Sequence, residues 1–300
     1  MQLQTGLIVL LTSALIVTVL FLFIFNVHRR KHCAEKDCVC TPPTQPVHVR
    51  IRCVNMHMLP MFPTQHVPHA VFRNADVLVM QEIFSSAFLN THADTLRHRF
   101  PHKTFATATK HVLRGSVTDS GLAIAVNKAM PVKVLEFSPF KNGKYVDSFA
   151  SKGVVVFCVA GIPMATTHFQ ATYDEARTHA DDLLRLHQFS HAIDVCVRNG
   201  AVFLAGDINT SSKSTLEKMD AIVRMKTEGV GYRAQQDDLT TAPFYGVSPK
   251  KWASSRKQYG EAIDYVWILK PLQNTPTVSV TYDLTDAFTD HAMLTFDIVV

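Results

Sequence analysis

Hydrophobic and polar positions follow two periods along most of this chain. Short apolar runs, several of them alternating with polar residues, predict β-strands, and apolar residues at helical spacing predict helices over 173–197 and 214–227. The predicted strands cover residues 47–55, 76–82, 120–126, 153–160, 163–167, 201–207, 262–269, 277–282 and 292–300. Strands and helices that alternate in this way predict one domain of the α/β or α+β class, built on β-sheets.

The N-terminal pattern is different, because Leu7–Phe25 is apolar and carries no charge. As a helix it would span roughly 28 Å, about the thickness of the hydrocarbon core of a membrane. A cleaved signal peptide would follow a basic start, which Met1–Gly6 lacks, so the pattern favours an uncleaved anchor. The basic flank 28–32 then predicts a single-pass membrane protein with a cytosolic domain, and it suits anionic lipid head groups.

These patterns predict an anchor over 1–28, a linker over 29–46 and a folded domain over 47–300. The linker holds Cys33, Cys38 and Cys40, whose spacing suits zinc poorly; juxtamembrane palmitoylation and unmodified thiols both fit. Six cysteines in this length do not predict a disulfide framework.

Composition sets broad limits on the molecule. With 300 residues, of which 47% are hydrophobic, the chain can bury a substantial core. A formal charge of +5 and a pI of about 8.9 suit an anionic surface but do not single out nucleic acid.

Polar side chains recur at the ends of the predicted strands. Gly206 lets the chain turn, and Asp207 and Asn209 then project to the same side. Other strand ends carry Asn55, Glu82, His168, Asp264, Asp290 and His291. Each has an ordinary explanation when taken alone, such as a turn cap or a surface ion pair. Their recurrence predicts one polar site along the sheet edges.

The chemistry of this residue set favours metal-assisted attack on a phosphate. The oxygen ligands of Glu82, Asn55 and Asp290 suit Mg²⁺, with Mn²⁺ as the alternative. Such an ion polarises a phosphoryl oxygen. His291, oriented by Asp264, is suited to deprotonate a water for in-line attack.

The motifs around these residues resemble the endonuclease/exonuclease/phosphatase superfamily, in the same order and at similar spacing. They are Gln81-Glu82, Ser120-Gly121-Leu122-Ala123, Thr167-His168-Phe169-Gln170-Ala171, Gly206-Asp207-Ile208-Asn209, Ile263-Asp264-Tyr265-Val266 and Asp290-His291. The resemblance covers about residues 47–300. It implies a four-layer αββα sandwich of two mixed β-sheets, with the site at one end of the sheets.

Within that superfamily the chain is similar to the neutral sphingomyelinases. The likeness rests on Asp119-Ser120-Gly121-Leu122, on Asp147-Ser-Phe-Ala-Ser-Lys152-Gly153, and on the histidine motif followed by Arg177 and Arg185-Leu-His-Gln188. It implies a phospholipase C-type phosphodiesterase that cuts sphingomyelin, or a related choline phospholipid, into ceramide and phosphocholine. The loop 237–259, where a head-group pocket would be completed, does not match the family.

The resemblance also implies a role for each site residue. The ligands of Mg²⁺ would be Glu82, Asn55 and Asp290. The residues around the phosphate would be His168 and Asn209 for charge on the phosphoryl oxygens, Asp207 for positioning the nucleophile or leaving group, and His291 as general base. Lys152 would either meet the phosphate or pair with Asp147.

Two other functions stay open at this point. A nuclease would need a basic surface that follows a phosphate backbone, and 250–257 offers the only cluster, which a solvated face explains equally well. The predicted membrane span argues against nucleic acid as a partner. An inactive anchored scaffold would normally have lost Glu82, Asp207 or His291, and this chain retains all three.

Overall fold

A computed structural model describes the folded part of the chain, and Cys38–Val300 form one compact unit within it. The described residues are 40, 43–58, 69–72, 75–84, 92–107, 119–144, 147–148, 150–172, 178–236, 262–281 and 291–300.

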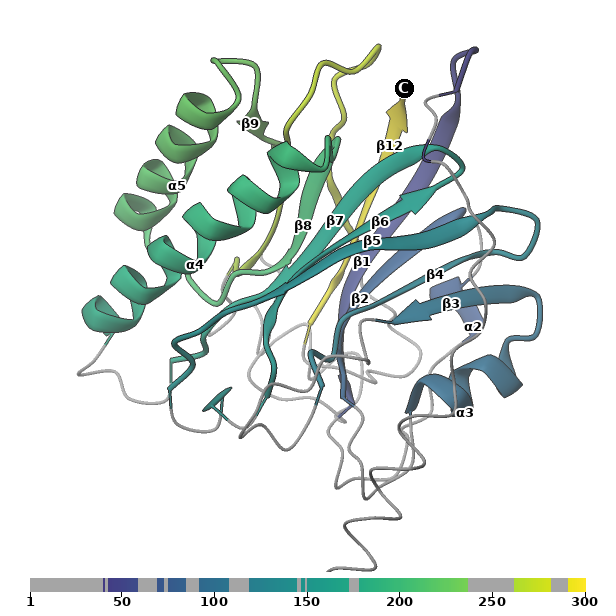
Figure 1. Ribbon diagram of the computed structural model, residues 1–300, viewed down its shortest axis with the longest axis horizontal. Coiled ribbons are helices and arrows are strands. Elements are labelled where there is room, and N and C mark those ends of the chain that lie inside the picture. Colours follow the sequence, from purple (N-terminus) through teal and green to yellow (C-terminus); the bar gives the residue numbers. More distant parts are fainter. Residues whose placement is uncertain are drawn as a thin grey trace, which may run out of the picture. The chain divides into compact units, whose positions relative to one another are not determined.

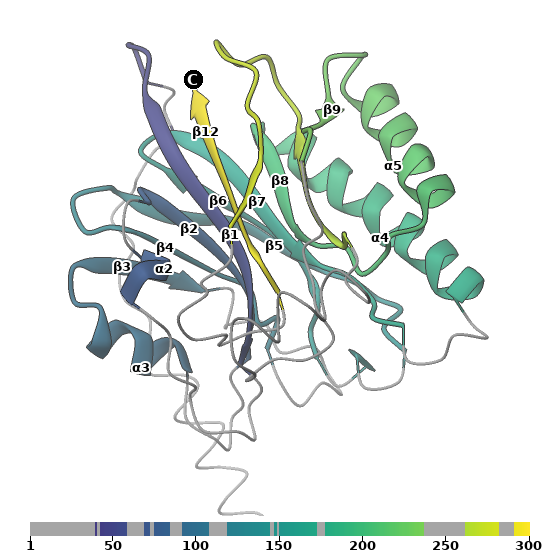
Figure 2. The same ribbon diagram turned by 180° about the vertical axis from the view of Figure 1, so that it is seen from behind.

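Two six-stranded sheets make the framework (Figures 1 and 2). The first has the order β11-β12-β1-β2-β4-β3 and the second β5-β6-β7-β8-β10-β9. In the first sheet β1 and β2 are parallel, in the second β7 and β8 are parallel, and the other neighbours are antiparallel. The strands are β1 (His48–Met58), β2 (Val77–Ile83), β3 (Lys103–Thr107), β4 (Ala123–Asn127), β5 (Val132–Pro139), β6 (Gly153–Val159), β7 (Ile162–His168), β8 (Phe203–Asp207), β9 (Tyr232–Arg233), β10 (Asp264–Ile268), β11 (Ser279–Thr281) and β12 (Met293–Val299).

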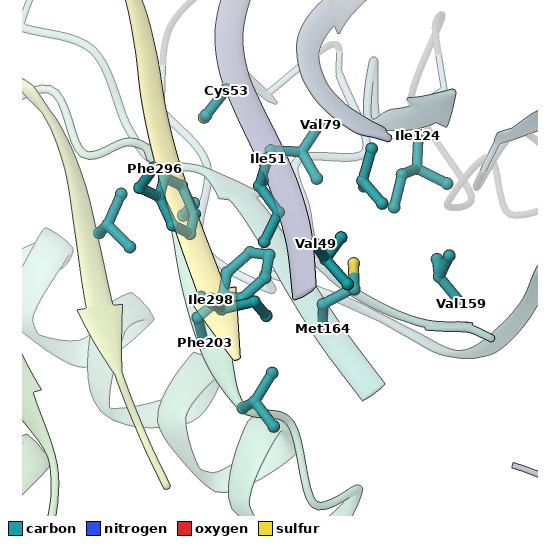
Figure 3. Packing of buried hydrophobic residues seen from close by; sticks show 14 of the residues in the cluster. Val49, Ile51, Cys53, Val79, Ile124, Val159, Met164, Phe203, Phe296 and Ile298 are labelled. Atoms are coloured by element: carbon teal, nitrogen blue, oxygen red, sulfur yellow. The ribbon is translucent and has the colours of Figure 1, made fainter. Parts of the chain in front are cut away.

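Alternate residues of each strand point inward, and these residues are apolar, so they form a hydrophobic core between the two sheets. Ile51 and Val79 contribute from the first sheet, and Phe203 from the second (Figure 3). The rings of Phe203 and Phe296 meet edge to face with their centroids 5.2 Å apart, which joins the sheets directly. Burial of each such side chain stabilises the fold by about 1.5–3 kcal/mol.

Helices cover the outer faces of both sheets. They are α2 (His69–Phe72), α3 (His92–Arg99), α4 (Thr178–Arg198) and α5 (Lys213–Lys226). Against the second sheet, α4 and α5 bury Phe189 and Met219 with Trp267, whereas Phe72 and Leu96 of α2 and α3 pack on the first sheet. The predicted sandwich of two mixed sheets is confirmed.

The predicted membrane topology is contradicted. Among the helices within the described ranges, none has both the length and the apolar character that a membrane crossing requires. The segment predicted to cross, Leu7–Phe25, lies outside the described residues. The prediction of a single-pass membrane protein with a cytosolic domain is therefore wrong. The function proposed for this chain does not include a membrane anchor.

A disulfide joins Cys40 to Cys158, near the end of β6. The cysteine spacing did not predict this bond, because its two residues are 118 positions apart. Disulfides form and persist in oxidising compartments, which is a physical reason to correct the predicted cytosolic location. The bond also leaves no thiol on Cys40 for palmitoylation, whereas Cys33 and Cys38 lie outside the described residues.

Candidate active site

The polar strand ends of the two sheets lie at the same end of the sandwich, which is the lower end in Figure 1. Strands β1, β2, β7 and β8 carry their polar residues at or near their C-terminal ends. Strands β10 and β12 are antiparallel to β8 and β1, so their polar residues lie at or just before their starts. The register places Asp207 beside both His168 and Asp264.

Asp207 is the centre of this cluster and is 1% exposed. Its Oδ2 accepts a 3.0 Å hydrogen bond from Asn55 Nδ2 and lies 3.6 Å from His168 Nε2 and 3.7 Å from His291 Nε2. Its Oδ1 accepts a 2.9 Å hydrogen bond from the backbone N–H of Asn209. One carboxylate therefore links β1, β7, β8 and the start of β12.

The electrostatics of the cluster are dominated by burial. Burial, assisted by the nearby carboxylates of Asp264 and Glu82 and opposed by His291 and Lys152, raises the pKa of Asp207 to about 7. The site therefore has more buried negative charge than its own cations balance.

His291 is held by Asp264. Its Nδ1 lies 2.8 Å from Asp264 Oδ2, and both side chains are almost fully buried. Since a carboxylate only accepts hydrogen bonds, this contact places the imidazole hydrogen on Nδ1 and makes Nε2 the basic nitrogen. Nε2 is the atom that faces Asp207.

A second buried group surrounds His168. Lys152 Nζ lies 2.7 Å from Asp147 Oδ1, 3.0 Å from His168 Nε2 and 3.0 Å from the carbonyl oxygen of Phe169. Burial, then the Lys152 charge and His291, lower the pKa of His168 well below its usual value, so its imidazole is neutral. The three N–H groups of Lys152 thus have three acceptors within the protein, which favours pairing with Asp147 over direct contact with phosphate.

Glu82 lies between Asn55 and a histidine that the sequence did not single out. Asn55 Nδ2 donates to Glu82 Oε1 at 3.0 Å, and His57 Nδ1 lies 3.5 Å from Glu82 Oε2. Asn209, on the other side of the cluster, donates from Nδ2 to the carbonyl oxygen of Phe169 at 3.1 Å. Asp290, the remaining predicted ligand, lies outside the described residues.

A buried network supports the loops that carry these groups. Arg185, 1% exposed, donates to Asp182 Oδ1 and to the carbonyl oxygen of Gln170, each at 2.7 Å, and to the hydroxyl of Thr172. Asp182 also accepts a 2.9 Å hydrogen bond from Thr210. Because these contacts join α4 to the loops after β7 and β8, they fix those loops relative to each other.

The donor set fits a divalent cation. Side-chain atoms of Glu82, His168 and Asp207 lie within 4.8 Å of one another, and so do those of Asp207, Asp264 and His291. Burial, and after it the nearby carboxylates of Asp264 and Glu82, raise the pKa of Asp207, and a bound cation would favour the ionised form of such a group. Carboxylate oxygens are the ligands that Mg²⁺ and Mn²⁺ prefer.

Comparison with known proteins finds similarity in structure alone. No protein-family model and no curated protein sequence matches the chain. Beta toxin from Staphylococcus aureus matches with a TM-score of 0.61 at 17% identity, covering 83% of this chain and 99% of that one. A mutant of that toxin has been solved with bound magnesium ions.

Two further solved structures extend the comparison. Sphingomyelinase C from Streptomyces griseocarneus matches with a TM-score of 0.60 at 20% identity, covering 84% of this chain and 99% of that one. An endonuclease/exonuclease/phosphatase from Bacteroides vulgatus matches with a TM-score of 0.53 at 15% identity, covering 84% and 98%. The resemblance seen in the sequence is confirmed: this chain has the fold of the endonuclease/exonuclease/phosphatase superfamily, and its structural neighbours include sphingomyelinases.

Proposed function

We propose that this chain is a divalent-metal-dependent phosphodiesterase of phospholipase C type, acting on sphingomyelin or a related choline phospholipid. The observation that carries the proposal is the line of side chains from Asp264 through His291 to Asp207, with Glu82 at the far side of Asp207. A base and a cation-binding carboxylate at two sides of one cluster are what metal-assisted hydrolysis of a phosphodiester requires.

The attacking water would lie between His291 and Asp207. Their facing atoms, Nε2 and Oδ2, are 3.7 Å apart, so one water can be within about 2.8 Å of both. His291 Nε2 takes the proton as the water attacks phosphorus, and Asp264 stabilises the imidazolium that forms. The bond between phosphorus and the lipid oxygen breaks, and the lipid leaves as an alcohol after its oxygen takes a proton from solvent. Asp207 accepts the second hydrogen and so orients the oxygen lone pair.

Charge on the phosphoryl oxygens would be met by a neutral donor and by the ion. Asn209 and His168 flank Asp207 on the side away from Asp264. The second N–H of the Asn209 amide can donate to phosphate, whereas His168 Nε2 accepts from Lys152 and carries no hydrogen there. Lys152 acts through His168, which it holds in place. Held by Glu82, and with Asn55 and Asp290 as the further ligands that the resemblance assigns, Mg²⁺ would polarise a phosphoryl oxygen and offset the developing charge.

The choice of a choline phospholipid rests on similarity. Sphingomyelinase C from S. griseocarneus is covered almost completely by the match, and a beta toxin mutant carries magnesium. Three motifs of the sequence, including Lys152-Gly153, also resemble the neutral sphingomyelinases. The Bacteroides neighbour is an endonuclease/exonuclease/phosphatase, which makes a nuclease the alternative to test.

Hydrolysis assays on the full chain test the proposal. Sphingomyelin vesicles, lysophosphatidylcholine and double-stranded DNA would each be incubated with Mg²⁺ and with EDTA. His291→Ala removes the base, and His48→Ala, an exposed histidine at the far end of β1, is the matched control.

We expect Mg²⁺-dependent release of phosphocholine that His291→Ala lowers by at least about a thousandfold and His48→Ala leaves unchanged. DNA nicking with intact lipid would replace the proposal with a nuclease. If none of the three substrates is turned over in the presence of Mg²⁺, the result would support an inactive scaffold instead.

A further inference from the structure

Among the described residues, His57 is the one imidazole near Glu82 to which the resemblance gives no role. It follows Asn55 by two residues at the end of β1, and its side chain is 25% exposed. The two oxygens of Glu82 face different partners: Oε1 faces Asn55 and His168, and Oε2 faces His57 Nδ1 at 3.5 Å. At 3.5 Å this contact is longer than a normal hydrogen bond, so it does not fix a hydrogen on His57 Nδ1, and Nδ1 and Oε2 can both offer a lone pair at the more open side of the cluster.

The backbone is bent to make this pair. Strand β1 follows β2 in register as far as Asn55 opposite Gln81, and then shifts so that Met58 lies opposite Ile83. At this bulge His57 has a φ of 48°, and Glu82 on the other strand has a φ of 54°. Left-handed backbone costs a residue with a side chain about 1 kcal/mol or more, and bulges beside active sites re-aim side chains.

Asn55 presents a hydrogen-bond donor to the carboxylates of the cluster. Its Oδ1 accepts a 3.0 Å hydrogen bond from the backbone N–H of His57, so its amide nitrogen is the group that points to Glu82 and Asp207. An amide N–H donates to anions and does not bind a cation. In this geometry the next electron-pair donor along β1 is His57 Nδ1, where the resemblance would place an oxygen ligand on Asn55.

We propose that His57 Nδ1 binds the divalent cation together with Glu82 Oε2, and that this nitrogen shifts the preference of the site from Mg²⁺ toward Mn²⁺ and Co²⁺. The inference rests on the metal requirement of the proposed function. Two adjacent ligands of an octahedral ion, each at about 2.1 Å, are about 3.0 Å apart, so the 3.5 Å pair needs only a small adjustment. Imidazole nitrogen favours transition-metal ions, whereas Mg²⁺ favours oxygen.

The variant His57→Asn separates ligand chemistry from backbone effects. Asparagine tolerates the left-handed conformation better than most residues, so the bulge at residue 57 is retained. The substitution replaces an imidazole nitrogen by an amide oxygen, a ligand that Mg²⁺ accepts. His48→Asn, at the other end of the same strand, is the matched control.

The readout is metal binding to the full chain without substrate. Pulsed electron paramagnetic resonance of bound Mn²⁺ detects a directly bound ¹⁴N, and titration calorimetry gives the affinity for Mg²⁺, Mn²⁺ and Co²⁺. We expect the ¹⁴N signal in the wild type and in His48→Asn, and its loss in His57→Asn. Affinity for Co²⁺ and Mn²⁺ should fall about tenfold in His57→Asn while affinity for Mg²⁺ changes less than about twofold.

The outcomes are distinguishable from a failure of the proposed function. A ¹⁴N signal that survives in His57→Asn but disappears in His168→Gln assigns the imidazole to His168 and overturns the inference, while leaving the phosphodiesterase proposal intact. Equal loss of affinity for all three ions also overturns it, because the substitution would then act on structure. Absence of any cation binding by the wild type overturns both proposals.

Discussion

Replacing Asp207 with asparagine should stabilise the metal-free protein while abolishing its activity. Burial holds the pKa of this carboxyl at about 7, against an ordinary value of 3.8. Above pH 4 the unfolded chain gives up this proton, whereas the folded protein retains it up to about pH 7. Raising the pH therefore favours unfolding of the wild type through Asp207, and an asparagine at this position does not titrate.

The size of the effect follows from the two pKa values. The difference between 3.8 and about 7 corresponds to about 4 kcal/mol of lost stability at pH 8, and to less than half of that at pH 5. Asparagine can accept from Asn55 or from the backbone of Asn209 but not from both with full strength, which costs about 1–2 kcal/mol. The variant should thus gain about 2–3 kcal/mol at pH 8 and nearly nothing at pH 5.

Urea unfolding of both proteins in EDTA at pH 5 and pH 8 measures this difference. A gain in the free energy of unfolding at pH 8 that shrinks toward zero at pH 5 is the expected result. Mg²⁺ should stabilise the wild type more than the variant, because the cation relieves the charge that the substitution removes. A variant that is less stable at pH 8, or whose difference does not change with pH, would show that the buried charge of Asp207 does not oppose folding.

Three further substitutions test the frame around the site. Gly206→Ala places a Cβ 2.0 Å from the carbonyl oxygen of Thr167 on β7, so it should cost at least about 3 kcal/mol in urea unfolding and most of the activity. Cys158→Ser opens the bond to Cys40, whose 118-residue separation predicts a loss of about 4–5 kcal/mol; the variant's thermal midpoint should not respond to dithiothreitol, while that of the wild type falls. Arg185→Lys keeps the charge but loses the planar fork that joins two loops, and should lower kcat about tenfold with a smaller change in KM.

The sequence predicts the central strands of both sheets and the edge strand β11, and it misses the edge strands β3, β5 and β9. Strands β2, β7 and β8 are mostly buried, and short apolar runs identify them, whereas β1 is identified by its alternation of apolar and polar residues. Strand β5 lies at an edge, every one of its residues is only partly buried, and a bulge between Val134 and Glu136 breaks its alternation. Strand β3 is also an edge strand, is short, and begins with a lysine. Too few residues of β3 and β5 are buried for an alternation of apolar and polar residues to reveal these strands.

The site was predictable where its chemistry depends on strand ends. Parallel pairing of β1 with β2 and of β7 with β8 brings their C-terminal ends together, so a sequence pattern of polar strand ends already implies a common edge. The disulfide was not predictable, because its residues are distant in sequence and meet only in the folded chain. His57 was missed for a related reason: its position opposite Glu82 depends on a bulge and on a left-handed residue, which no side-chain periodicity encodes.

Backbone strain and buried charge coincide at this edge of the sheets. Three non-glycine residues with positive φ, His57, Glu82 and Asn209, belong to the cluster around Asp207. Each of these residues costs about 1–3 kcal/mol of folding free energy, and the buried carboxylate costs several more. This region therefore lowers the stability of the fold when no cation is bound. The apolar cores on both faces of each sheet offset this cost in folding free energy. A site that is strained and negatively charged before the cation binds can return that energy as cation affinity, because the ion neutralises the charge while the backbone already holds its ligands in place.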